Sequence, residues 1–245
     1  MTTTPPPAPR RTGPPGGPPP LAPALAYAVL AVVAVALSAT LPHPSASAAS
    51  VLAYDRTHHT ALQVAGFLNF GASLPLAIWT ATAYRRMRTL GVTAPGAVIG
   101  LAGGLLATAS LALSGLVTWT AAQIDAAGTT ADPALAHALA DLAFATGGPG
   151  FVVPFALLLA GIAVPSLLLR FVPKALAWTG LVIAGVGVLS TLTLLTSALD
   201  VTLPIGRFGG LLWLIATSVA LPRTRHEVGR NVASVRADQA PAVTS

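Results

Sequence analysis

A histidine and an aspartate four residues apart, His137 and Asp141, have types and a spacing that could do chemistry. They lie in the stretch ADPALAHALADLAFATGGPG, where Asp132 followed by Pro133 predicts the start of a helix. Aspartate caps free backbone amides there, and proline suits the first helical turn. Residues four apart share one face of a helix. The pair could relay a proton, bind a metal ion or form an ion pair, and the spacing leaves these alternatives open.

Arg207 lies just inside the apolar start of the last hydrophobic segment. An arginine at depth in a membrane is costly unless it reaches the interface or pairs. We expect either an ion pair with Asp141 or Asp200, fixing the last helix, or a role in holding an anionic substrate group. Asn69 is an amide in an apolar segment that can bond across helices or bind a ligand. Asp141, Arg207, His137 and Asn69 are therefore the candidate ligand-binding residues.

Other chemistries find little support in the sequence. Asp55, His58 and His59 precede the second apolar segment, but adjacent histidines point to different sides of a helix, and no HExxH spacing occurs. The absence of cysteine excludes thiolate catalysis and cysteine metal sites. We expect no metal, no cofactor and no catalytic residue. The alternative is an outer-face or intramembrane enzyme that uses His137 and Asp141.

The composition indicates that lipid is the solvent for most of the chain. Hydrophobic residues make up 54% of the 245 positions and charged residues only 8%, whereas a soluble domain carries about 25% charged residues. The formal net charge of +6 does not indicate nucleic acid, because the basic residues are scattered between apolar runs and form no basic face. The lipid bilayer is thus the expected partner.

The apolar segments predict an all-α fold, an integral membrane six-helix bundle, since about 20 residues cross a hydrocarbon core of about 30 Å. The transmembrane domain is expected over residues 21–221, with helices at 21–41, 61–84, 95–122, 151–169, 175–199 and 203–221. The amphipathic stretch that begins at Asp132 is expected to form a short external interfacial helix. The Pro-rich residues 1–20 and the basic residues 222–245 are expected to be disordered cytoplasmic tails.

Lysine and arginine counts in the connections predict the orientation. All but two of the 13 lysines and arginines lie in the tails and in the second and fourth connections, and only Arg56 and Arg207 lie on the other side. We therefore expect a multi-pass protein of the cell membrane with cytoplasmic N- and C-termini. A competing interpretation is cleavage after PSASAAS at residues 44–50, which would leave five helices in the same orientation. The apolar run 21–41 is longer than the roughly 7–15 residues typical of a cleavable signal.

Small residues recur every three or four positions in several segments, which predicts faces where helices pack closely. The recurring positions include Gly66, Ser73, Thr80, Gly100, Gly103, Ala107, Ser114, Gly180, Ala184 and Gly187. The first segment lacks such a polar stripe, so we expect it at the periphery of the bundle. A homo-oligomer, a membrane partner protein and a small-molecule substrate all stay open.

Three runs, DLAFATGGPGFVVPFALLLAG, RFGGLLWLIA and LNFGASLPLAIWTATAYRRMRTLGV, resemble uncharacterised actinobacterial multi-pass membrane proteins of the domain-of-unknown-function type. The resemblance covers residues 61–221. It implies a membrane location and a helix number, and it implies no catalytic residue. The sequence thus predicts a non-enzymatic multi-pass membrane protein, either transporter-like or a sensing or assembly component.

Overall fold

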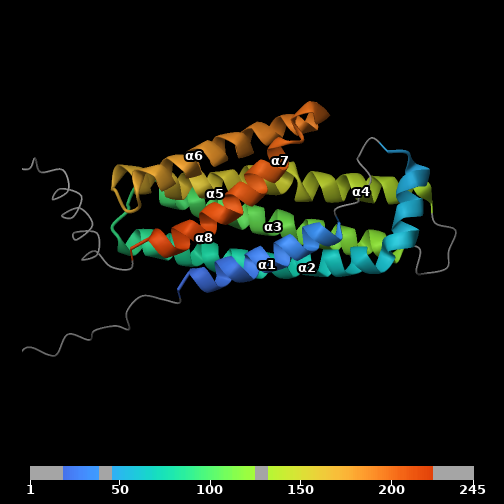
Figure 1. Ribbon diagram of the computed structural model, residues 1–245, viewed down its shortest axis with the longest axis horizontal. Helices are drawn as coiled ribbons and strands as arrows, with labels where there is room; N and C mark the ends of the chain where they lie inside the picture. Colours follow the sequence, from blue (N-terminus) through green and yellow to red (C-terminus); the bar gives the residue numbers. More distant parts are fainter. Residues whose placement is uncertain (1–18, 39–45, 125–131, 223–245) are drawn as a thin grey trace, which may run out of the picture.

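The computed structural model describes residues 19–38, 46–124 and 132–222, which form helices and short turns without a strand (Figure 1). This confirms the all-α prediction. The elements are α1 (Leu21–Leu37), α2 (Ala48–Thr89), α3 (Gly96–Gln123), α4 (Pro133–Gly147), α5 (Pro149–Leu168), α6 (Lys174–Leu189), η1 (Ser190–Leu194), η2 (Ser197–Leu199), α7 (Thr202–Pro204), η3 (Ile205–Gly209) and α8 (Gly210–Ala220). The predicted disordered tails and the first residues of PSASAAS lie outside the described residues, apart from 19, 20 and 222.

Within the part of the chain that the structure describes, five helical stretches are long and apolar enough to cross a membrane. They are Ala48–Thr89, Gly96–Gln123, Pro133–Leu168, Lys174–Leu194 and Ser197–Ala220. α1 is apolar but has only 17 residues, which at a rise of 1.5 Å per residue gives about 25 Å. A sixth crossing therefore stays a prediction.

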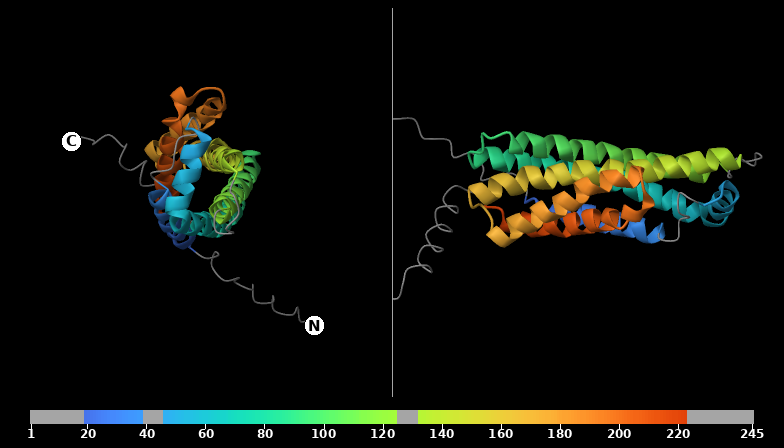
Figure 2. Two further views of the ribbon diagram at one scale, coloured as in Figure 1. Left: turned by 90° about the vertical axis from the view of Figure 1, so that its right-hand side faces the viewer. Right: turned by 90° about the horizontal axis from the view of Figure 1, so that it is seen from above.

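α2 begins earlier than the predicted helix 61–84. Ser47 caps it, since the Ser47 side chain accepts a hydrogen bond from the Ser50 amide at 3.3 Å. The backbone leaves helical geometry at His58, with φ −120° and ψ 17°. Residues 48–57 consequently turn away from the long axis of α2 and lie across one end of the bundle (Figure 2). A segment that was expected to be a connection is thus a helix that covers this end.

α4 starts where the sequence predicts, with an Asp132 carboxylate oxygen accepting from the Ala134 amide at 2.9 Å. A separate interfacial helix is not confirmed, because α4 runs on in the direction of α5 and packs against α3 (Figure 1). Gly148 joins the two helices and maintains the hydrogen bonding. Its amide donates to Phe144 at 2.6 Å and its carbonyl accepts from Val152 at 2.9 Å.

The predicted helix 175–199 ends early, at Leu189, and continues as the 3₁₀ turns η1 and η2. Hydroxyls in this stretch donate to carbonyls three residues back. Ser190 donates to Gly187 at 2.6 Å, and Thr193 donates to Ser190 at 2.8 Å. Such local bonds compete with the α-helical pattern and favour the tighter turn.

The predicted glycine faces are confirmed as the places where helices approach most closely. A Cβ built on Gly66 of α2 would lie 2.7 Å from the carbonyl oxygen of Gly115 in α3, and one built on Gly161 of α5 would overlap the backbone of Gly100. No side chain fits there, so the backbones of α2, α3 and α5 are in direct contact. This close packing fixes the three helices that carry much of the site described below.

α1 packs with one face against α2 and α8 and leaves the other face exposed, with Val29 62% exposed, which agrees with the expected peripheral position. Tyr27 of α1 is only 1% exposed, and its ring lies tilted against Phe155 with centroids 6.3 Å apart. Ala24, Ala31 and Ala34 are buried on the same face. Alanine alone therefore allows α1 to pack against α2 and α8 without a polar stripe.

The two ends of the bundle differ in charge. We call the end covered by residues 48–57 the acidic end, because it carries Asp55, Asp132 and Asp141. The opposite end, the basic end, carries Arg85, Arg86, Arg88, Arg170 and Lys174 in the turns after α2 and α5. Apart from Arg56 in the segment 48–57 and Arg207 in η3, the basic side chains of the described residues therefore lie at the end opposite to Asp55, Asp132 and Asp141.

Candidate functional site

A cavity of about 330 Å³ lies toward the acidic end and has all four candidate residues in its wall. Asn69 comes from α2, His137 and Asp141 from α4, and Arg207 from η3. The remaining wall is largely apolar and includes Val35, Val51, Leu62, Val152, Leu203 and Phe208. Small-molecule sites typically enclose about 300–1,000 Å³, mostly apolar with a few polar groups. The cavity fits the lower part of that range.

Arg207 is held by a carbonyl and an aromatic ring. One of its terminal nitrogens donates to the Gly147 carbonyl at 2.9 Å, and its guanidinium carbon lies 4.9 Å from the Phe151 ring centroid. The expected ion pair with Asp141 or Asp200 is not among the contacts of the described residues. Arg207 thus faces the cavity as a cation whose other N–H groups have no carboxylate partner in the described part of the chain.

The local fold explains how Arg207 reaches this position. η3 is a π-helical turn, wider than an α-helical turn and frequent at functional sites. Gly206 lets the turn come close to α5, because a Cβ at this position would lie 2.6 Å from a Val152 methyl group. The GRFGG sequence therefore places the arginine between α4 and α5, beside the joint at Gly147.

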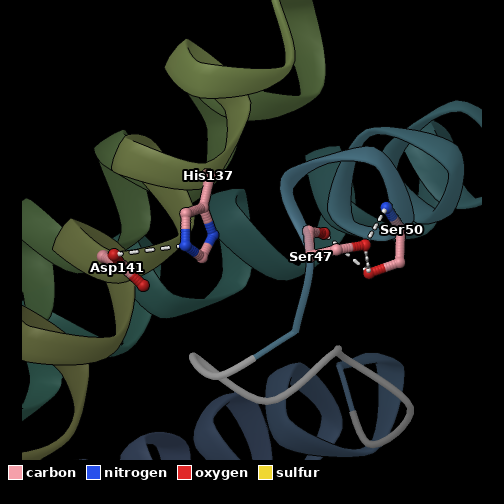
Figure 3. Close-up of polar contacts among 4 residues, drawn as sticks. All are labelled: Ser47, Ser50, His137 and Asp141. Carbon is pink, nitrogen blue, oxygen red and sulfur yellow. Dashed lines mark hydrogen bonds and ion pairs between the residues drawn. The ribbon is translucent and has the colours of Figure 1, made fainter.

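His137 and Asp141 share one face of α4, as predicted (Figure 3). The imidazole Nε2 lies 3.9 Å from a carboxylate oxygen of Asp141, whose side chain is 50% exposed. This distance exceeds that of a hydrogen bond and allows a weak ion pair when the histidine is protonated. The His137 Nδ1 is buried without a hydrogen-bond partner. Within residues 19–38, 46–124 and 132–222, no three metal-ligating side chains gather to hold a metal ion.

The side-chain oxygen of Asn69 is buried in the cavity wall and, like the Nδ1 of His137, has no hydrogen-bond partner. The neighbouring hydroxyls are engaged, since Ser114 donates to the Ala143 carbonyl at 3.2 Å and Thr118 donates to the Ser114 carbonyl at 2.8 Å. A buried acceptor without a donor costs about 1–3 kcal/mol. The Asn69 oxygen is therefore an acceptor available to a donor inside the cavity.

Asp55 is a member of the cavity wall that sequence reasoning did not select. Its side chain is 6% exposed and lines the cavity from the segment that covers the acidic end. The sequence grouped it with His58 and His59, but both histidines are exposed, and the His58 ring stacks on Tyr54 at 4.2 Å. The available signal was the helical spacing of Asp55 from Val51, which turns both toward the bundle.

Comparisons of the chain with protein-family models, with curated proteins and with solved structures find no match. The resemblance to actinobacterial multi-pass proteins therefore stays a prediction. The function has to be inferred from the geometry of this site alone.

Proposed function

We propose that this chain is a six-helix integral membrane protein of the cell membrane that binds a small molecule in the cavity at its acidic end. The five long apolar helices support the membrane location. The separation of basic and acidic ends supports an orientation with both termini in the cytoplasm, since lysine and arginine favour the cytoplasmic side. The cavity then lies toward the outside of the cell.

The observation that carries the proposal is the meeting of Asn69, His137, Asp141 and Arg207 in one cavity. They come from three separate elements, and two of them present buried polar atoms without a partner. Unpaired polar groups in an apolar wall are what fix the orientation of a bound ligand.

Binding for transport or sensing is favoured over catalysis by the state of the hydroxyls and of the histidine. Ser114 and Thr118, two hydroxyls of the cavity wall, donate to backbone carbonyls. The Nε2 of His137 lies 3.9 Å from the Asp141 carboxylate, beyond hydrogen-bond distance. Nucleophilic catalysis needs a nucleophile and a base within hydrogen-bond reach, typically about 2.6–3.2 Å. The described residues offer no such pair around His137.

Cysteine accessibility tests the proposal directly, because the natural chain has no cysteine. Thr118→Cys places a thiol in the cavity wall. Leu116→Cys, on the opposite face of α3 and 49% exposed on the apolar surface, is the matched control. In intact cells, a charged maleimide that does not cross membranes should modify Thr118→Cys and leave Leu116→Cys unmodified, since a lipid-facing thiol ionises poorly.

A second substitution tests whether the reagent reaches Thr118→Cys through the cavity. Ala140→Phe adds a ring to the α4 wall and should slow modification of Thr118→Cys by filling the space. The proposal is wrong if Thr118→Cys is unreactive from outside, or if Leu116→Cys reacts equally fast.

A further inference from the structure

Arg207 and Asp55 are opposite charges that line the same cavity without meeting each other. Arg207 contacts the Gly147 carbonyl and the Phe151 ring. Asp55 is a buried residue of the segment 48–57. Neither has an ion-pair partner among residues 19–38, 46–124 and 132–222. Buried charges are normally paired, so two unpaired charges of opposite sign in one cavity need an explanation.

The elements that carry the two charges pack near opposite ends of α4, so α4 gives a scale for how far apart they lie. Arg207 contacts Gly147 at the last turn of α4. Asp55 lies one helical turn after Val51, which packs with Leu52 against Ala136 near the first turn of α4. From Ala136 to Gly147 the axial rise is about 16 Å at 1.5 Å per residue. The cavity is therefore elongated, with a cation at one end and a carboxylate at the other.

The wall between the two charges is mainly apolar. Leu62 and Val152 contribute alkyl groups, and the Asn69 oxygen is an acceptor without a donor. Asp141 is a second carboxylate of this wall, but its side chain is 50% exposed and lies 3.9 Å from the His137 Nε2. Arg207 and the buried Asp55, which have no ion-pair partner among the described residues, approach α4 near opposite ends, and the largely apolar wall between them suits a hydrocarbon chain.

We propose that the cavity binds a slender zwitterion, with its carboxylate on Arg207, its amine on Asp55 and an apolar chain between them. This inference rests on the proposed function, because it names the ligand class of the same site. Arginine suits a carboxylate, since its fork of N–H donors matches the two carboxylate oxygens. Asp55 offers an acceptor to an ammonium group. A short zwitterion such as glycine cannot reach both charges.

The volume agrees with a chain of moderate length. A cavity of about 330 Å³ lies at the lower end of the range of small-molecule sites, about 300–1,000 Å³. The probe 8-aminooctanoate carries a carboxylate at one end of an unbranched apolar chain and an amine at the other. Octanoate has only its carboxylate and octylamine only its amine, so these two probes separate the ends.

The test measures how strongly each probe slows maleimide modification of Thr118→Cys. In the otherwise natural chain, 8-aminooctanoate should protect at lower concentration than octanoate, octylamine or glycine. Arg207→Gln should weaken protection by 8-aminooctanoate and octanoate about tenfold, which is the loss expected for one charge-assisted interaction. The same substitution should leave octylamine unchanged. Asp55→Asn should have the opposite effect: it should weaken protection by 8-aminooctanoate and octylamine, and leave protection by octanoate unchanged.

Controls separate a lost contact from a lost fold. Arg170→Gln removes an exposed arginine at the basic end and should alter protection by none of the probes. Each variant must still be modified at Thr118→Cys without a probe, which shows that its cavity is intact. If Arg207→Gln loses this reaction, Arg207→Lys is used instead. Lysine keeps the positive charge but lacks the paired N–H donors of the guanidinium group, so this variant should also weaken protection by octanoate and 8-aminooctanoate.

Distinct outcomes overturn the two proposals. If Thr118→Cys reacts but no probe protects it, the ligand class is wrong and the outward-facing cavity stands. If octanoate protects as well as 8-aminooctanoate and Asp55→Asn changes nothing, the amine end is wrong and with it the zwitterion. If Thr118→Cys never reacts, the proposed function itself fails.

Discussion

Replacing Arg207 with methionine separates a ligand-binding arginine from one that holds the fold together. Methionine keeps a long flexible side chain and removes the charge and its donors. A structural ion pair predicts a large loss, because removing one partner of a buried pair costs about 3–5 kcal/mol. The contacts of Arg207 predict a much smaller change in the free energy of unfolding.

The magnitude follows from those contacts. The hydrogen bond to the Gly147 carbonyl, at 2.9 Å, is worth about 1.5–3 kcal/mol for a charged donor. The Phe151 ring, 4.9 Å from the guanidinium carbon, adds about 0.5–2 kcal/mol. Against this, an arginine within a membrane helix costs about 2.5–3.5 kcal/mol, which methionine avoids. The two lost contacts and the avoided cost of the arginine nearly cancel. We therefore expect the free energy of unfolding to change by no more than about 2 kcal/mol in either direction.

Thermal unfolding of the full chain in lipid nanodiscs, followed by circular dichroism, measures this balance. For a chain of this size 1 kcal/mol corresponds to a shift in Tm of about 2–4 °C. We expect Arg207→Met to shift Tm by less than about 8 °C, and Arg170→Met, an exposed control, by less than about 2 °C. A fall of more than about 10 °C for Arg207→Met would refute the reasoning and indicate a structural ion pair.

Two further substitutions test the packing that positions the site. Gly161→Ala should destabilise the protein by about 1–3 kcal/mol, because its methyl group would overlap the Gly100 backbone, whereas Gly185→Ala, with open space around it, should be neutral or stabilising by up to about 1 kcal/mol. Equal Tm shifts for these two variants would contradict the close contact of α3 and α5. Trp79→Phe should cost about 1–3 kcal/mol, since the buried indole donates to the Ser218 hydroxyl at 2.7 Å. In a double-mutant cycle, Ser218→Ala should cost less when Trp79 is already phenylalanine, and simple additivity would show that the bond contributes nothing.

Helix packing was the part of the fold that the sequence predicted best. Glycines at Gly66, Gly100 and Gly103 recur at helical spacing, and in lipid such spacing has a single strong consequence, the close approach of backbones. The cap at Asp132 was predictable for a similar reason, because the start of a helix depends on a few neighbouring residues. Both inferences rest on local chemistry.

The arrangement at the acidic end could not be predicted in the same way. Asp55, His58 and His59 make the first turns of α2 polar, so an apolar-segment criterion excludes them from the helix. Gly148 lies between a glycine and a proline, which indicates a turn, yet its hydrogen bonds carry the helix onward into α5. In each case the local composition allows two backbone paths, and packing against distant helices selects one.

Counting charges on each side of the membrane does not predict which group contacts Arg207. The sequence places Asp141 and Asp200 on the same side of the membrane as Arg207, so charge balance favours an ion pair. Which carboxylate reaches the guanidinium depends on the π-helical turn η3, which directs Arg207 to the Gly147 carbonyl instead. Asp55, which the sequence did not connect with Arg207, then becomes the buried opposite charge in the same cavity. Each unpaired charge costs folding free energy, and a ligand that carries both complementary charges would reduce both costs at once. Under the proposed binding mode, ligand binding would therefore stabilise this end of the bundle through the same two side chains.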